Sequence, residues 1–253
     1  MVVFDPACES YACWNPAEGL VIRRVADRTE LQRLPTGDVP YPVRRLCFSP
    51  NGGLLAAAYG NPERFRLQVW ELQRAELRCD VVVEGSRQPL AFSPDNRFIV
   101  VGDAQGVLHV HDLARGQEIK QFQVMKTPAQ IVFYPDGTRL AGCGDQNRDV
   151  QVVDFETGTI LKALPHPGTV GEPSWHPDGV LLATPCQDFQ VRLWDVASGT
   201  VRTVLEGHAG EVTGVKFNHA GDLLVSSGWD GVTRFWDPIS GNEGFSLPGG
   251  FAA

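Results

Sequence analysis

A period of about 42 residues runs through the whole chain. At this period an aromatic residue recurs two positions before a proline in five places, and Phe217 with His219 gives a sixth, variant copy. The five pairs are Phe4 with Pro6, Phe48 with Pro50, Phe92 with Pro94, Phe133 with Pro135 and Trp175 with Pro177. Successive aromatic residues are 44, 44, 41, 42 and 42 positions apart. Because a regular period of this length is the signature of a repeat protein, the chain is predicted to consist of tandem copies of one small structural unit.

Each period has the pattern of short strands separated by tight turns. Within residues 207–247, turn sequences such as Asn-His-Ala-Gly and Trp-Asp-Gly separate runs of apolar and β-branched residues, which is typical of β-hairpins. The expected strands are Val212–Phe217, Leu223–Ser227, Val232–Trp236 and a fourth through Phe245 and Leu247. No stretch shows a helical apolar stripe, and the 27 glycines and 18 prolines suit a fold rich in turns.

A four-stranded sheet of this size cannot bury both of its faces alone, and radial stacking of such sheets hides each face against a neighbour. The prediction is therefore an all-β fold, a β-propeller of four-stranded antiparallel blades, forming a single region over residues 1–253. Six blades are visible. Their approximate ranges are 1–36, 37–82, 83–123, 124–164, 165–206 and 207–250.

Two of the repeats carry a recognisable pair of dipeptides. Gly207-His208 precedes Trp236-Asp237, and Pro165-His166 precedes Trp194-Asp195 at the same distance. With these motifs and the period, the chain resembles the WD-repeat family. The segment that begins Trp175-His176-Pro177 and the repeated Pro-Asp-Gly turns resemble bacterial WD-repeat regions, some of which are attached to Ser/Thr kinases.

The same two repeats each contain a polar quartet at matching steps of 18, 4 and 6 residues. The quartets are His208, Ser226, Asp230 and Trp236, and His166, Thr184, Asp188 and Trp194. One interpretation is a Ser-His-Asp hydrolase triad. The family resemblance implies the other, a structural network in which Asp accepts from His, His bonds the hydroxyl and the hydroxyl bonds the indole. Duplication at the repeat period favours the structural network, so no catalytic residue is predicted.

The resemblance also implies a docking face. In WD-repeat rings partners commonly bind the loops that open each blade, and the matching positions are Gln187, Glu211, Thr213 and Trp229. Trp229 is either an exposed anchor for a partner or a residue packed over the rim of the central channel or over a neighbouring loop.

Composition excludes several other functions. The net charge of −8 disfavours a nucleic-acid surface, and no apolar run is long enough to span a membrane. The six cysteines form no C-x-x-C pair and there is no signal peptide, which favours reduced thiols in the cytoplasm.

His109 and His111 share a strand face but lack further ligands, so neither a metal nor a cofactor is predicted. Arg23, Arg24, Arg28, Arg33, Arg44 and Arg45 are expected to be a solvated blade margin; the alternative is a contact for phosphate or an acidic peptide.

The sequence therefore predicts a non-catalytic scaffold for a protein or peptide partner. The alternatives are an accessory or sensor region of a larger bacterial signalling protein such as a Ser/Thr kinase, and a propeller enzyme. Each end of the chain completes its own blade. The ring is therefore either a six-bladed monomer closed by packing or part of a ring of seven or more blades. The second is favoured, because an uncovered blade face would be a large apolar patch.

Overall fold

The computed structural model describes residues 1–37, 41–61, 63–85, 89–124, 128–144 and 147–249, and every regular element in these residues is a β-strand. They form two compact units, Met1–Gln121 (unit 1) and Phe122–Ala253 (unit 2). The described residues contain no helix that is long and apolar enough to cross a membrane.

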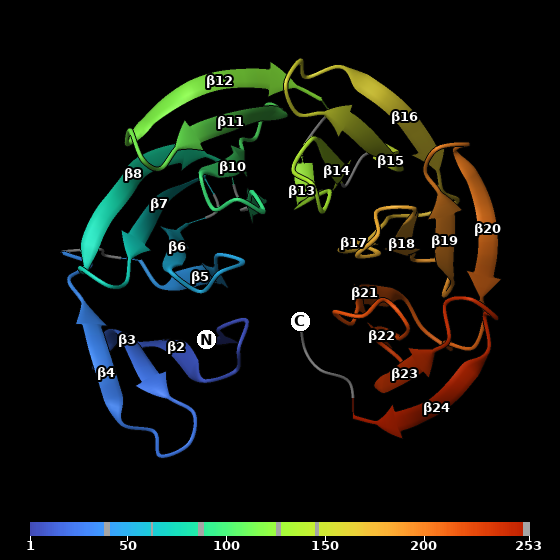
Figure 1. Ribbon diagram of the computed structural model, residues 1–253, viewed down its shortest axis with the longest axis horizontal. Coiled ribbons are helices and arrows are strands. Elements are labelled where there is room, and N and C mark those ends of the chain that lie inside the picture. The colour runs from blue at the N-terminus through green and yellow to red at the C-terminus, as the bar shows by residue number, and fades with distance from the viewer. Residues whose placement is uncertain (38–40, 62, 86–88, 125–127, 145–146, 250–253) are drawn as a thin grey trace. The chain divides into compact units, whose positions relative to one another are not determined.

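Unit 1 holds three four-stranded antiparallel sheets, apart from the last two residues of β12, and each sheet is built from strands that follow one another in the chain (Figure 1). Sheet 1 consists of β1 (Val2–Phe4), β2 (Ser10–Asn15), β3 (Gly19–Arg24) and β4 (Glu30–Leu34). Sheet 2 consists of β5 (Val43–Phe48), β6 (Leu54–Gly60), β7 (Arg64–Glu71) and β8 (Glu76–Glu84). Sheet 3 consists of β9 (Leu90–Phe92), β10 (Phe98–Gly102), β11 (Val107–Asp112) and β12 (Gln117–Gln123).

Unit 2 repeats this arrangement three more times (Figure 1). Sheet 4 consists of β13 (Pro128–Phe133), β14 (Arg139–Gly144), β15 (Asn147–Asp154) and β16 (Ile160–Pro165). Sheet 5 consists of β17 (Ser174–Trp175), β18 (Leu181–Pro185), β19 (Val191–Asp195) and β20 (Thr200–Leu205). Sheet 6 consists of β21 (Val212–Phe217), β22 (Leu224–Gly228), β23 (Val232–Trp236) and β24 (Glu243–Pro248).

In sheets 3 to 6 the turn between the third and fourth strands contains an Asp followed four residues later by Gly, and the Gly amide donates to the Asp carbonyl. In sheet 6 the amide of Gly241 donates to the carbonyl of Asp237 at 2.8 Å, and the Asp237 carboxylate accepts the amides of Ile239 and Ser240. Gly241 has φ = +74°, a conformation that L side chains rarely adopt. The same spacing occurs at Asp112–Gly116, Asp154–Gly158 and Asp195–Gly199, so these four sheets share one turn.

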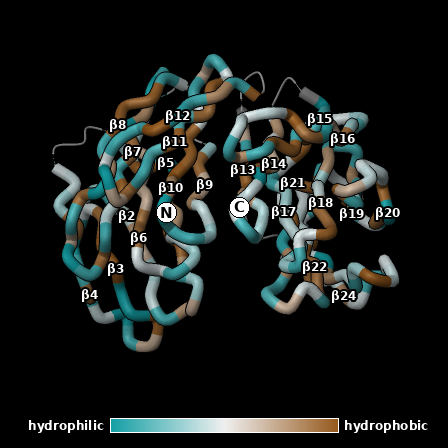
Figure 2. The backbone as a smooth tube through the Cα atoms, turned by 45° about the horizontal axis from the view of Figure 1, so that its top comes forward, coloured by the Kyte–Doolittle hydropathy of each residue, from teal (hydrophilic) through white to brown (hydrophobic). Residues whose placement is uncertain are grey.

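Neighbouring sheets within each unit pack their apolar faces together. In unit 1, Phe65 and Leu67 of sheet 2 lie in one buried cluster with Ile99 and Val101 of sheet 3. In unit 2, Leu193 of sheet 5 lies in one cluster with Trp236 of sheet 6. Brown hydrophobic stretches in Figure 2 follow strands such as β10 and β18. Burial of apolar side chains between sheets is the main favourable contribution to the stability of such a repeat fold.

The six four-stranded antiparallel sheets confirm the predicted all-β fold.

Within the sixth repeat, β22 begins at Leu224 because Leu223 belongs to the preceding turn. The Leu223 amide donates to Oδ1 of Asn218 at 3.1 Å and its carbonyl accepts from the Asn218 amide at 2.9 Å. Strands β8 and β16 end at Glu84 and Pro165, slightly beyond the expected limits of their repeats.

Candidate functional site

The quartet in sheet 6 forms one continuous chain of hydrogen bonds. His208, in the loop before β21, places Nδ1 2.9 Å from Oδ2 of Asp230 and Nε2 2.7 Å from Oγ of Ser226. The indole N–H of Trp236 donates to the same Ser226 oxygen at 2.8 Å. The three donors and three acceptors of these bonds are matched when Nδ1 carries the His208 proton and the serine hydroxyl donates to Nε2.

Asp230 is the charged end of this series of hydrogen bonds. Burial alone would raise the pKa of its carboxyl, but the hydrogen bonds from the Ala209 amide, His208 and the Val232 amide outweigh burial, so the pKa lies below its ordinary value. A carboxylate held in this way fixes both the loop that contains His208 and the turn between β22 and β23.

The quartet in sheet 5 is only partly assembled. His166 Nε2 lies 2.8 Å from Oγ1 of Thr184, which also accepts the indole N–H of Trp194 at 3.0 Å. Nδ1 of His166, however, donates to the carbonyl of Leu164 at 2.8 Å. Burial lowers the pKa of His166 to about 4, so its ring is neutral near pH 7.

Asp188 lies outside this network, contrary to the expectation that it would accept from His166. Its carboxylate pairs with the guanidinium of Arg192, with N–O distances of 3.0 and 2.5 Å. The residue that corresponds to Ala209 is Pro167, which has no N–H to donate to Asp188. Arg192 is available because Val201 stands where sheet 6 has Glu243, the residue that pairs with Arg234 at 2.7 Å.

Neither hydroxyl is placed as an accessible nucleophile. Ser226 is 1% exposed and Thr184 is fully buried, and each oxygen already accepts an indole N–H. The arrangement therefore satisfies buried polar groups and joins a loop to a sheet.

The role of the hydroxyl is clear from sheet 2, which has the tryptophan but not its partner. The strand position that holds Ser226 in sheet 6 holds Ala57 in sheet 2. The indole nitrogen of Trp70 is accordingly buried without a hydrogen bond.

The four candidate docking residues lie on loops and strand ends of sheets 5 and 6. Trp229 is 78% exposed, so it does not pack over neighbouring residues of the described chain. Its amide donates to the carbonyl of Glu211 at 2.8 Å. Gln187 is exposed and its Oε1 accepts from Thr169 at 3.3 Å. Thr213 is half-buried and donates to the carbonyl of Ser227.

Phe189 is a further exposed aromatic residue, which the sequence analysis missed. It is 47% exposed, lies in the turn between β18 and β19, and has φ = +70°. The corresponding residue in sheet 6 is Gly231, also at φ = +70°. A phenylalanine at a turn position where the next repeat has glycine was the available signal.

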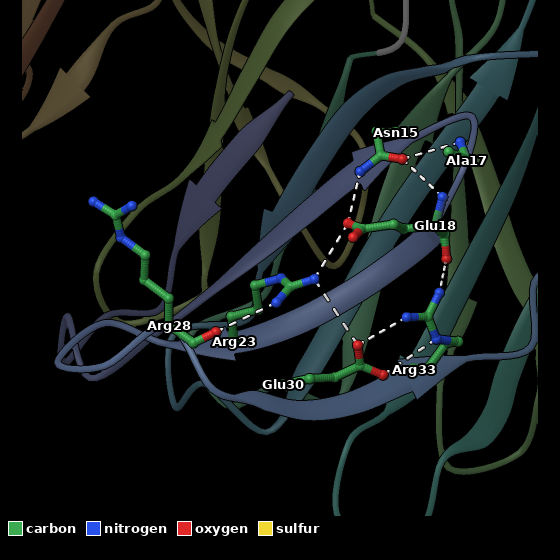
Figure 3. Close-up of polar contacts among 7 residues, drawn as sticks. All are labelled: Asn15, Ala17, Glu18, Arg23, Arg28, Glu30 and Arg33. Atoms are coloured by element: carbon green, nitrogen blue, oxygen red, sulfur yellow. Dashed lines mark hydrogen bonds and ion pairs between the residues drawn. The ribbon is translucent and has the colours of Figure 1, made fainter.

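The arginine cluster of unit 1 is largely neutralised by neighbouring carboxylates (Figure 3). Arg23 lies 3.2 Å from Glu18 and 3.9 Å from Glu30, and Arg33 lies 2.8 Å from Glu30. The Arg28 side chain points away from this network in Figure 3. Arg24 pairs with Asp27 at 3.1 Å, Arg44 contacts the Gly60 carbonyl, and Arg45 also has an interaction. This arrangement matches a solvated margin better than an anion site.

His109 and His111 both lie on β11, but they have different surroundings. His109 contacts Asp103 and Glu118, each at 3.2 Å, whereas His111 is buried. Within the part of the chain that the structure describes, no three His, Cys, Asp or Glu side chains are grouped to hold a metal ion.

Comparison with protein families gives matches in unit 2. Residues 158–195 and 199–237 match the family model described as WD domain, G-beta repeat (WD40). These two segments are similar to WD40 repeats. Each repeat starts near the last strand of one sheet and ends at the third strand of the next, so a WD40 repeat spans β16–β19 or β20–β23 rather than one sheet.

The curated proteins with similar sequences are matched over only part of their length. It is 25% identical over 69% of its length to a serine-threonine kinase receptor-associated protein of Gallus gallus, covering 50% of that protein. It is 28% identical over 88% of its length to periodic tryptophan protein 2 of Arabidopsis thaliana, covering 25%. It is 25% identical over 57% of its length to the U3 small nucleolar RNA-associated protein 21 homolog of Schizosaccharomyces pombe, covering 16%. The chain thus spans half or less of these relatives, which are eukaryotic and give no support for a bacterial origin or an attached kinase.

Proposed function

We propose that this chain is a non-catalytic scaffold that binds a protein or peptide through the loops of sheets 5 and 6 in unit 2. The observation that carries the proposal is the exposure of Trp229 on a backbone that is fixed from both sides. Its amide bonds the Glu211 carbonyl, and the next residue, Asp230, is held by His208 and the Ala209 amide. An anchor that is already positioned loses little conformational entropy when a partner binds.

The neighbouring side chains give the surface its chemistry. Phe189 adds a second exposed aromatic ring from the corresponding turn of sheet 5, while Gln187 and Glu211 add polar groups. Exposed aromatic anchors surrounded by polar residues are typical of protein interfaces. The two matched WD40 repeats lie in the same unit, and this also supports the proposal.

The test compares two equally exposed residues. Trp229 and Ile239 are both 78% exposed, but Ile239 lies in the turn between β23 and β24. Tagged wild type, Trp229→Ala and Ile239→Ala are used as baits, with quantitative mass spectrometry of the captured proteins. We expect specific partners to be lost with Trp229→Ala and retained with Ile239→Ala. Equal recovery with all three baits would contradict the assignment.

The non-enzymatic character rests on the buried hydroxyls of Ser226 and Thr184. The competing hydrolase would require Ser226 as its nucleophile. If a hydrolytic activity is found in the pure protein and Ser226→Ala folds normally but abolishes it, the scaffold proposal is wrong.

We also propose that the partner is neither nucleic acid nor a membrane surface, because the net charge of −8 opposes binding to phosphates. The RNA association in one relative's name remains a property of that protein. All six cysteines are free, which supports a reducing location such as the cytoplasm. Fractionation of cells that express the tagged protein tests the location.

An accessory role in a larger signalling protein, such as a Ser/Thr kinase of bacteria, remains a proposal that rests on sequence resemblance alone. That the intact ring has seven or more blades is likewise a proposal. The gene's full reading frame tests the first, and light scattering with an electron-microscopic image of the full product tests the second.

A further inference from the structure

Unit 1 contains a hollow that the loops of unit 2 do not involve. It has a volume of about 410 Å³ and lies between β8 of sheet 2 and β11 and β12 of sheet 3. Val82 and Glu84 line it from β8, His109 and His111 from β11, and Glu118 from β12. Asp103, in the turn before β11, completes the group that matters for its chemistry.

The hollow is acidic. Its lining includes the carboxylates of Glu84, Asp103 and Glu118 and, among the described residues that form it, no lysine or arginine. His109 lies between two of these carboxylates, with Nε2 3.2 Å from Asp103 and Nδ1 3.2 Å from Glu118. The ring therefore fixes the Glu118 carboxylate in place. Glu84 is exposed, and its carboxylate has no ion pair with any residue that the structure describes.

His111 is the second and independent sign of a ligand. It is only 4% exposed and lines the hollow, yet its ring nitrogens have no hydrogen-bond partner in the described chain. The reason is local: His111 occupies the strand position of Trp236, and Val101 occupies that of Ser226. Burial lowers the pKa of His111, so an unprotonated ring nitrogen is present near neutral pH. The fully enclosed side-chain atoms that lack a partner in the described chain do not include the His111 nitrogens, so a ring nitrogen of this otherwise buried side chain is open to the hollow.

We propose that this hollow binds the guanidinium group of an arginine side chain presented by a protein partner. A guanidinium is planar and carries five N–H donors, so it can bond several acceptors that surround it. Glu84, Glu118 and the neutral ring of His111 provide acceptors from three strands. Val82, which is 62% exposed on β8, provides an apolar surface for the methylene groups of the arginine.

The acceptors favour an organic cation over a metal ion. No three of the His, Cys, Asp or Glu side chains in the described part of the chain are placed to ligate one ion. This site is also separate from Trp229 and its neighbours, which belong to unit 2. The failure of one proposal therefore leaves the other intact.

The test is a titration of the whole protein with N-acetyl-L-argininamide, followed by the NMR signals of the His109 and His111 rings and the Val82 methyl groups. N-acetyl-L-citrullinamide, which has the same shape without the charge, is the matched ligand control. Glu84→Gln and Glu118→Gln each remove one carboxylate from the hollow. Glu206→Gln makes the same change in charge on an exposed residue of unit 2.

We expect saturable shifts at the three reporter residues with the arginine compound only. Glu84→Gln and Glu118→Gln should each weaken binding about fivefold, as expected for loss of a partly exposed charged contact, and Glu206→Gln should not change it. His111→Phe should weaken binding without lowering the thermal midpoint, because the His111 ring makes no hydrogen bond to the described chain, and His111→Asn should restore part of the affinity.

Three results would overturn the proposal. The citrulline compound could produce the same shifts as the arginine compound, which would remove the role of charge. The two glutamine variants could bind as tightly as Glu206→Gln. Alternatively, Zn²⁺ could saturate the three reporters while the arginine compound leaves them unchanged, which would make the hollow a metal site.

Discussion

The indole nitrogen of Trp236 lies 2.8 Å from the hydroxyl oxygen of Ser226, which itself lies 2.7 Å from Nε2 of His208. Trp236 packs among apolar residues of sheet 5, including Leu193 and Leu205. One side chain thus joins the polar network of sheet 6 to the apolar core between two sheets.

Removal of this side chain should strongly reduce stability. We expect Trp236→Ala and Trp194→Ala each to lower the free energy of unfolding by about 3 to 5 kcal/mol, as is usual for buried aromatic residues. Trp229→Ala should change it by less than about 0.5 kcal/mol, because that ring is exposed. Urea unfolding followed by circular dichroism measures all three. A loss below about 1 kcal/mol for both buried residues would show that their burial is overestimated.

The two aspartates of the quartets should differ in their contributions. Asp230→Ala leaves the buried Nδ1 of His208 and the Ala209 amide without their acceptor, so we expect a loss of about 2 to 3 kcal/mol. Asp188→Ala removes an ion pair from Arg192, which keeps a hydrogen bond to Gln190 at 2.8 Å. Its expected cost is about 1 kcal/mol. Equal losses in urea unfolding would mean that Asp188 does support His166.

His166 should make the protein less stable in mild acid. Its folded-state pKa of about 4 lies below the ordinary value of 6.5, so between these values the unfolded chain binds a proton that the folded chain does not. Stability from this group is therefore complete above pH 6.5 and falls as the pH decreases towards 4. We expect a loss of about 1 to 3 kcal/mol at pH 4.5 relative to pH 7.5. His166→Gln, which cannot titrate, should show a smaller loss over the same range in paired urea titrations.

Two turn glycines allow the stability cost of backbone strain to be measured apart from the cost of steric contact. Gly241 and Gly231 have φ = +74° and +70°, but a Cβ on Gly241 would lie 2.7 Å from Cγ2 of Thr203, whereas one on Gly231 meets nothing within 4 Å. Gly231→Ala should cost about 1 kcal/mol from strain alone. Gly241→Ala should cost more, by about another 1 kcal/mol, because Thr203 must move. Equal thermal midpoints for the two variants would refute the contribution of the contact.

The strands and turns of sheet 6 were largely predictable, with the start of β22 shifted by one residue, because local chemistry sets most of their boundaries. The Asp237-to-Gly241 turn, for example, is closed by its own backbone and side-chain hydrogen bonds. The 18-residue step from His208 to Ser226 was also sufficient to pair them. These features depend on residues that are near in sequence or share one strand register.

The prediction for Asp188 was wrong because more than one hydrogen-bond partner lies within reach of its side chain. Asp188 has the same spacing as Asp230, but Pro167 removes one donor and Arg192 supplies another. The sequence already shows that Pro167 stands at the position corresponding to Ala209, and the loss of its N–H donor was the signal that Asp188 would bind elsewhere. The hollow around His111 was not predictable, since its lining comes from strands of two sheets whose packing no local pattern determines.

The offset between WD40 repeats and sheets has a consequence for how such a chain can change in length. Each matched segment contributes the fourth strand of one sheet and the first three strands of the following one. Tandem duplication or deletion of one such segment by recombination would therefore preserve every four-stranded sheet at the junction. The gene can gain or lose copies without creating an orphan strand, and new loop sequences can diversify in the added copy while the existing sheets stay intact.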